Sequence, residues 1–255
     1  MKKEVLDTAA RAGRMLLENG AEISRVEESM ERICRSYGTG EESFYVLSNG
    51  LFLTAEDEDG SSYALAEHIP LSAVRMDRIE ALNTLSRDIE HGKYTPREAN
   101  DVMDRIADMP EKHALHQALA SGVGAAAFCC LPGGSLKDTL TAFLAGILLQ
   151  FFLAGPGKHL SKASSIILGS ALVSAVCCLS YCCSFGKAMN YMMIGSVMPL
   201  IPGVGFVVSI HDIVEGDYLS GFIRLLDALL VFFCIALGVA VTLSAAANLM
   251  GGELL

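Results

Sequence analysis

The sequence predicts an α-helical integral membrane protein with about five transmembrane helices and an N-terminal α+β cytoplasmic domain. Hydrophobic residues make up 52% of the 255 residues, and charged residues make up 19%. The charges are unevenly spread. Residues 1–113 hold 14 lysines and arginines against 23 acidic residues, whereas residues 114–255 hold 5 against 6. Because a bilayer tolerates few charges, we assign 1–113 to the soluble domain and 114–255 to the membrane domain.

The composition also argues against several functions. The net charge of −10 disfavours binding to nucleic acid, which requires a basic surface. The phosphate-binding pattern G-x-x-x-x-G-K-[ST] is absent from the sequence, and no paired nucleophile motif indicates a hydrolase. We therefore expect neither an enzyme nor a bound cofactor. Charged residues interrupt the start of the chain, so we expect no cleavable signal sequence.

The soluble domain begins with a predicted helical hairpin. Apolar residues recur at helical spacing over Val5–Leu16 and again over Ile23–Tyr37. Asn19-Gly20 ends the first helix, because this pair tolerates the left-handed backbone found at helix ends.

Three short strand-like runs follow. They predict an antiparallel sheet and comprise Phe44–Leu47, Leu51–Thr54 and Tyr63–Leu65. Asn49-Gly50 and Asp59-Gly60 separate the runs, and both are favourable hairpin turns. Helical spacing then returns over Met76–Ile89. A further helix begins at Thr95-Pro96-Arg97-Glu98, which has the pattern of a capping box.

The membrane domain contains five apolar stretches. A spanning helix needs about 20 predominantly apolar residues, and the candidates are Ala114–Leu131, Leu136–Ala154, Ala163–Ser184, Ala188–Ile210 and a helix within Leu219–Leu249. Glycines inside these spans predict close helix packing. Lys158 and Lys162 lie in the loop after the second span, and this basic bias favours a cytoplasmic location for the soluble domain.

The fourth span is interrupted. Pro199, Pro202, Gly203 and Gly205 lie within its apolar run. Proline removes a backbone donor and glycine allows the chain to leave helical geometry. Inside a bilayer the freed backbone groups need partners in the protein or in a water-filled cavity. A broken helix of this kind is typical of solute pathways.

Ionisable residues follow the interruption. Asp212, Arg224 and Asp227 are the candidates for the pathway, and we expect Arg224 to pair with Asp227 one helical turn away. The alternative is that these side chains lie at the headgroup level and anchor the helices. We prefer that alternative for Glu215 and Asp217.

Three other groups resemble metal sites without completing one. Glu56–Gly60 is acidic but lacks the EF-hand spacing. Cys178 and Cys182 lie one turn apart in an apolar helix, where small packing residues are the simpler interpretation. His113 and His116 have no third ligand nearby in the sequence. We expect no metal site.

Several short motifs resemble those of the threonine/serine exporter family, in its N-terminal-half subunit form. They are the run Leu17–Glu27, the run Arg75–Leu85 with Gly92, and Pro199–Gly203 followed by Asp212, Gly216-Asp217, Gly221 and Arg224. Their order and spacing extend the resemblance over nearly the whole chain.

The resemblance implies an inner-membrane exporter of small polar metabolites, threonine and serine in some members and succinate in others. Other members of the family are longer chains with a second group of spans. The resemblance therefore also implies that a second small membrane subunit, or further copies of this chain, complete the pathway. We expect coupling to the proton gradient, with Arg224 and the helix start at Gly203–Gly205 binding a substrate carboxylate. Asp212 and Asp227 would handle protons or the substrate amine. A membrane-anchored sensor or assembly subunit is the alternative.

Overall fold

The computed structural model describes residues 2–39, 42–56, 62–70, 74–110 and 113–249. It divides into two compact units. Unit 1 comprises Met1–Pro110 and Gly203–Leu226, and unit 2 comprises Glu111–Pro202 and Asp227–Leu255. Each is described by itself. The predicted division at residue 113 stays a prediction.

Unit 1 begins with the predicted helical hairpin, formed by α1 (Lys2–Glu18) and α2 (Ile23–Ser36). Gly20 has a φ of 82° directly after α1. The amides of Gly20 and Ala21 donate to the carbonyls of Leu17 and Leu16 at 3.0 and 3.1 Å. This bonding satisfies the last carbonyls of α1, and the predicted helix end at Asn19-Gly20 is confirmed.

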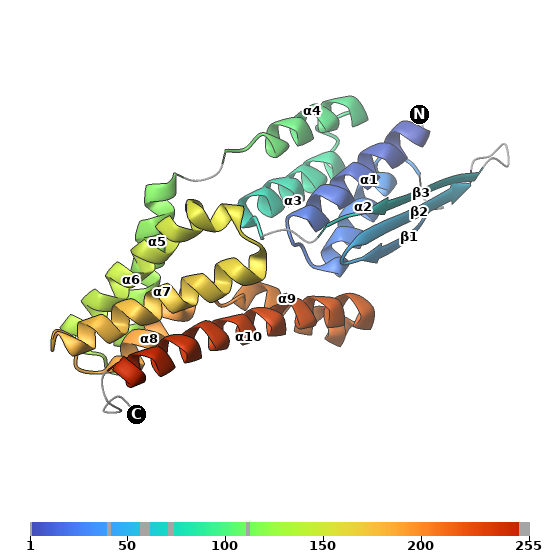
Figure 1. The fold of residues 1–255 in the computed structure, drawn as a ribbon. Helices are drawn as coiled ribbons and strands as arrows, with labels where there is room; N and C mark the ends of the chain where they lie inside the picture. Colours follow the sequence, from blue (N-terminus) through green and yellow to red (C-terminus); the bar gives the residue numbers. More distant parts are fainter. Residues whose placement is uncertain (1, 40–41, 57–61, 71–73, 111–112, 250–255) are drawn as a thin grey trace. The chain divides into compact units, whose positions relative to one another are not determined.

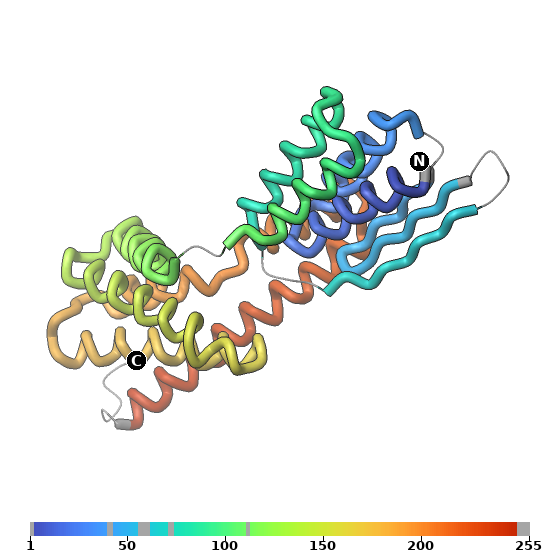
Figure 2. Tube along the Cα trace, turned by 90° about the horizontal axis from the view of Figure 1, so that it is seen from above, coloured from blue at the N-terminus to red at the C-terminus, as the bar shows by residue number. Residues whose placement is uncertain are grey.

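The predicted antiparallel sheet is also confirmed. Strands β1 (Glu42–Leu47), β2 (Gly50–Glu56) and β3 (Ser62–His68) lie side by side in that order (Figure 2). Val46 pairs with Leu51 in the register, and both are buried. Tyr45 and Phe52 pair on the opposite face and are exposed. The predicted turn at Asp59-Gly60 lies outside the described residues.

The remaining helices of unit 1 complete its core. α1 and α2 contact the sheet, and α3 (Met76–Glu90) and α4 (Pro96–Ala107) pack against these two helices (Figure 1). α4 starts with the predicted capping box, in which Thr95 and Glu98 bond each other's backbone amides. The core is closed by fully buried side chains from all four helices and the sheet, including Leu16, Met30, Leu53, Ile89 and Met103.

Unit 2 is helical. It contains α5 (Ala114–Cys130), α6 (Leu136–Ala154), the short η1 (Pro156–His159), α7 (Lys162–Cys182), α8 (Met189–Val197) and η2 (Met198–Leu200). The final helix, α10 (Tyr218–Leu249), begins in unit 1 and continues into unit 2, whereas α9 (Gly203–Glu215) belongs to unit 1.

The predicted close packing at glycines is confirmed in unit 2. A Cβ added at Gly146 would lie 2.8 Å from the Ser121 carbonyl oxygen of α5. A Cβ added at Gly195 of α8 would lie 2.5 Å from the Ala125 carbonyl oxygen. The helix backbones therefore approach too closely at these points for any larger residue.

Three described helices are long and apolar enough to cross a membrane: Leu136–His159, Lys162–Cys182 and Tyr218–Asn248. Met189–Leu200 and Gly203–Glu215 meet the same test only as a pair with a break between them, which would make four. The first predicted span, α5, is an apolar helix of 17 residues. The chain is therefore mostly helical with a small sheet, and the count of five spans stays a prediction.

Candidate functional site

The predicted interruption of the fourth span is present. α8 ends at Val197, Pro199 lies in η2, and Pro202 directly precedes α9. A Cβ added at Gly203 or Gly205 would meet no heavy atom within 4 Å. Packing therefore does not require glycine at either position. The break is confirmed, and its role in a pathway stays a prediction.

α9 and α10 form a tight helical hairpin in unit 1. Gly216 has a φ of 104°, and the Asp217 amide donates to the Asp212 carbonyl at 2.8 Å, which is the bonding of a glycine helix end. A Cβ added at Gly221 would lie 2.7 Å from the Ser209 carbonyl oxygen and 2.9 Å from the Ile213 amide nitrogen. α10 therefore packs directly on the backbone of α9.

Asp212 and Arg224 face each other across this hairpin. Asp212 is fully buried and Arg224 is 8% exposed. Asp212 Oδ2 lies 3.6 Å from Arg224 Nε, which is within ion-pair range but too long for a hydrogen bond. Among the described residues neither of these two atoms has a hydrogen-bond partner. The charges compensate each other, and each keeps one polar atom that a hydrogen-bonding group would satisfy.

The other atoms of this pair bind the turn between α1 and α2. Asp212 Oδ1 accepts a hydrogen bond from the Ile23 amide at 3.3 Å, and Arg224 Nη2 donates to the Ala21 carbonyl at 2.7 Å. Ile23 is the first residue of α2, whose preceding residue, Glu22, provides no side-chain cap. Asp212 therefore caps α2 from another element, because a carboxylate is favoured at a helix N-terminus.

A third contact ties the hairpin to the sheet. Ser220 Oγ accepts a hydrogen bond at 3.1 Å from the amide of Ser48, which lies in the turn that joins β1 and β2. Stretches about 200 residues apart in the chain therefore meet in unit 1. They include two of the motifs that carried the family resemblance, around Ala21 and around Asp212 and Arg224.

Two acidic residues lie close to this region and outside the apolar helices. Burial raises the pKa of Glu27, and the neighbouring charges of Asp217 and Glu31 raise it further, although a bond from the Val46 backbone opposes the shift. Burial also raises the pKa of Asp217, with a contribution from Glu215. Both carboxyl groups thus hold their protons more strongly than in water.

The predicted pair of Arg224 with Asp227 is wrong. Asp227 instead binds Lys162 of α7 within unit 2, with Lys162 Nζ 2.6 Å from Asp227 Oδ2. The Lys162 side chain is 58% exposed and that of Asp227 is 40% exposed. The reason is the buried carboxylate of Asp212, whose ion-pair partner among the described residues is Arg224, so that Arg224 is held on the α9 side.

The structure does not bring the predicted carboxylate-binding groups together. Asp212, which faces Arg224, lies nine residues after Gly203 in the same helix, a rise of about 14 Å. Arg224 therefore lies near the end of α9, whereas Gly203 and Gly205 lie at its start. A single site formed by the glycines and Arg224 is not present in this structure.

One buried carboxylate was missed by the sequence analysis. Asp138 is 1% exposed and lies in the first turn of α6, where it forms a capping box with Ser135. The pattern Ser-x-x-Asp before an apolar run is a recognisable helix-start signal. It was available in the sequence at Ser135-Leu136-Lys137-Asp138.

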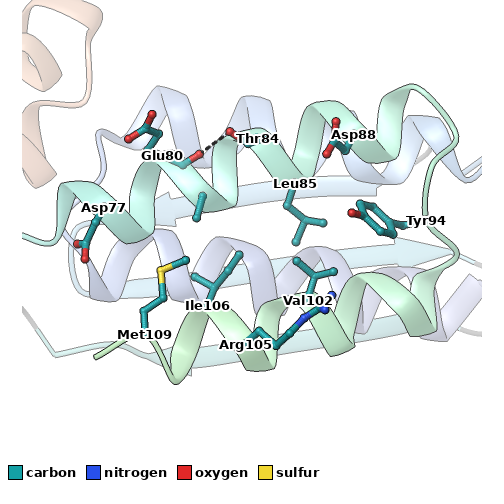
Figure 3. A pocket seen from close by; sticks show the side chains of 11 residues that line it. Asp77, Glu80, Thr84, Leu85, Asp88, Tyr94, Val102, Arg105, Ile106 and Met109 are labelled. Atoms are coloured by element: carbon teal, nitrogen blue, oxygen red, sulfur yellow. Dashed lines mark hydrogen bonds between the residues drawn. The ribbon is translucent and has the colours of Figure 1, made fainter. Parts of the chain in front are cut away.

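Unit 1 also has a groove of about 450 Å³ between α3 and α4 (Figure 3). Leu85, Val102 and Ile106 line its apolar part. Of the carboxylates on its α3 side, Asp77 is bound by Arg75, which lowers the pKa of Asp77 to about 2, and Asp88 is bound by Lys93. The chain's own cations thus neutralise two of its acids, and the predicted site residues lie elsewhere.

The long apolar helices are those expected of a membrane protein. A family model described as "Putative threonine/serine exporter" (ThrE) matches residues 7–246, and this chain belongs to that family. The family is one of transporters rather than enzymes.

Two relatives extend this assignment. The chain is 21% identical over 254 residues to a Mycobacterium tuberculosis protein named "Probable threonine/serine exporter"; the match covers 96% of this chain and 47% of that protein. It is 22% identical over 247 residues to the Escherichia coli "Probable succinate transporter subunit YjjP", and covers 95% of both. The chain thus spans about half of the first relative and nearly all of the second. No solved structure matches this chain.

Proposed function

We propose that this chain is a subunit of an inner-membrane secondary exporter of small polar metabolites, with threonine and serine as substrates and the proton gradient as driving force. The observation that carries the proposal is the broken segment whose second helix, α9, bears the buried Asp212, paired with Arg224 of α10. A carboxylate beside a guanidinium offers complementary charges to the amino and carboxylate groups of an amino acid.

The geometry supports a refined assignment of the site residues. Pro199 and Pro202 interrupt the helix and give the pathway its irregular backbone, and Gly203 and Gly205 follow in the first turn of α9. Arg224 and Asp212 are engaged by the backbone at Ala21 and Ile23 in this structure. Substrate binding to this pair therefore requires those bonds to be exchanged for bonds to the substrate.

Succinate, or another small dicarboxylate, is the second candidate substrate. The E. coli relative named as a succinate transporter subunit matches this chain over 95% of its own length. Its description as a subunit also supports a partner membrane subunit for this chain.

We propose further that residues 1–113 form the cytoplasmic domain, because the basic residues Lys158 and Lys162 favour that orientation.

Efflux from cells tests the substrate and the coupling together. Cells that express this chain, with and without a candidate small membrane subunit, are loaded with labelled threonine, serine or succinate. Faster efflux of threonine and serine than from cells without the chain is the expected result, and a protonophore should abolish the difference. Faster efflux of succinate alone would favour the dicarboxylate. Unchanged efflux of all three would contradict the proposal.

A further inference from the structure

Asp138 makes contacts in unit 2 that reach beyond its own helix. Oδ2 accepts hydrogen bonds from the Ser135 amide at 2.9 Å and the Ser135 hydroxyl at 2.6 Å. Oδ1 accepts from the amides of Lys187 and Ala188 at 2.6 and 3.2 Å. Four donors therefore engage the two oxygens of one buried carboxylate.

The second pair of bonds holds Lys187 and Ala188, the two residues that directly precede α8. Ala188 directly precedes α8 and supplies no side-chain cap of its own. A negative charge beside a helix N-terminus is favourable. Asp138 of α6 thus holds the start of α8. The approach is close, because a Cβ added at Gly186 would lie 3.2 Å from Asp138 Oδ1.

The rest of α8 is fixed by packing. Gly195 lies directly against the backbone of α5, and Ser196 Oγ lies 3.4 Å from Cys177 Sγ of α7. α8 continues into η2 and Pro199, where the span breaks. Close helix packing thus fixes α8 near its end, whereas hydrogen bonds to Asp138 fix the residues at its start.

We propose that Asp138 is a positioning residue for transport: it fixes the start of α8 and so holds the break at Pro199 in the arrangement that admits substrate. This inference rests on the proposed function, which places Pro199 on the solute pathway. A carboxylate with both oxygens engaged by backbone and hydroxyl donors is suited to holding a helix start. Asp138 therefore acts through α8 and makes no contact with the solute.

Hydrogen exchange tests the structural half of the inference. In the purified full-length chain, Asp138→Ala should speed amide exchange at Lys187 and Ala188 by about tenfold, since each amide loses a bond to a charged acceptor. Asp138→Asn keeps one acceptor oxygen and should give an intermediate rate. Ser135→Ala is the matched control, because it disturbs the α6 cap and leaves Oδ1 in place. Unchanged exchange in Asp138→Ala would overturn the inference.

Kinetics of threonine counterflow in proteoliposomes test the functional half. If the competent arrangement becomes less populated, Asp138→Asn should raise KM about threefold or more with a nearly unchanged maximal rate per folded protein. A merely structural role predicts a lower maximal rate with an unchanged KM, and that result would overturn the positioning role. If the wild-type chain transports nothing, the proposed function fails and this role fails with it, whereas the exchange result still decides whether Asp138 fixes α8.

Discussion

Arg224 and Asp212 show how a single ion pair can join distant parts of the chain. The two residues compensate each other's charge in a buried position, and each also bonds the backbone of the turn between α1 and α2. Removing one partner of a buried pair leaves the other charge uncompensated, which is costly even when the intact pair contributes little net stability.

Asp212→Asn should therefore destabilise the protein by about 3 kcal/mol. The amide cannot neutralise Arg224, although it retains an oxygen that can accept from Ile23. Thermal unfolding of the purified protein in detergent measures the effect. Glu215→Gln is the matched control from the same helix end, and its exposed side chain should change stability by less than about 0.5 kcal/mol. Equal unfolding temperatures for the two variants would contradict a structural role for the pair.

Glu27 gives a prediction about pH. The pKa of Glu27 is raised in the folded protein. Between the ordinary glutamate pKa and this raised value, the folded protein therefore keeps a proton that the unfolded chain has released. Glu27 thus favours folding most when protonated, and stability decreases as the pH rises from the ordinary glutamate pKa through the raised value. Glu27→Gln should unfold at a higher temperature than the wild type at pH 7, and the difference should disappear as the pH falls below about 4.3.

Glu28→Gln is the control for this measurement, because Glu28 lies on the same helix with an exposed side chain. It removes a partner of Arg32 and should not unfold at a higher temperature than the wild type at pH 7. A Glu27→Gln protein that is less stable than the wild type at pH 7 would show that the bond from the Val46 backbone outweighs burial and the repulsion from Asp217.

At the scale of elements, the α9–α10 hairpin depends on one close approach. Ser209 and Ile213 of α9 leave no room for a side chain at Gly221. The pattern of apolar residues could not reveal this, because helical periodicity gives the face that is buried and not the distance to the neighbouring helix. Gly205, by contrast, was predicted from the sequence as a pathway residue, yet a Cβ added there would meet no heavy atom within 4 Å.

Gly221→Ala should destabilise unit 1 by about 1–3 kcal/mol, since the added methyl group would overlap the α9 backbone. Gly205→Ala should be neutral or slightly stabilising, because alanine favours a helix more than glycine does and meets no neighbour. Thermal unfolding of the two variants side by side checks this. The reverse order of stability would mean that the two helices do not pack as described.

Most elements were predictable because their signals are local. The helical hairpin, the sheet and the capping box of α4 follow from spacing, turn pairs and the cap residues themselves. The partner of Arg224 was not predictable, since Asp227 is its neighbour in sequence whereas the actual contacts are Asp212 and Ala21. The hydrogen bonds that Lys187 and Ala188 donate to Asp138 were not predictable either, because these residues lie about 50 positions from Asp138 in the sequence.

For the whole molecule, the family assignment, the apolar helices and the broken segment agree on a membrane transporter. The chain spans 47% of one relative and 95% of the other. A pathway completed by a partner subunit or by further copies of this chain is compatible with both.

Counterflow of labelled threonine in proteoliposomes tests the central claim most directly. The purified chain is reconstituted alone and together with a candidate small membrane subunit, and uptake is compared with that of empty vesicles. We predict exchange of threonine and serine in at least one of the two preparations, with Arg224→Leu inactive and Glu215→Gln active. Folded wild-type protein that exchanges neither amino acid nor succinate in either preparation would contradict the account and favour a sensor or assembly subunit.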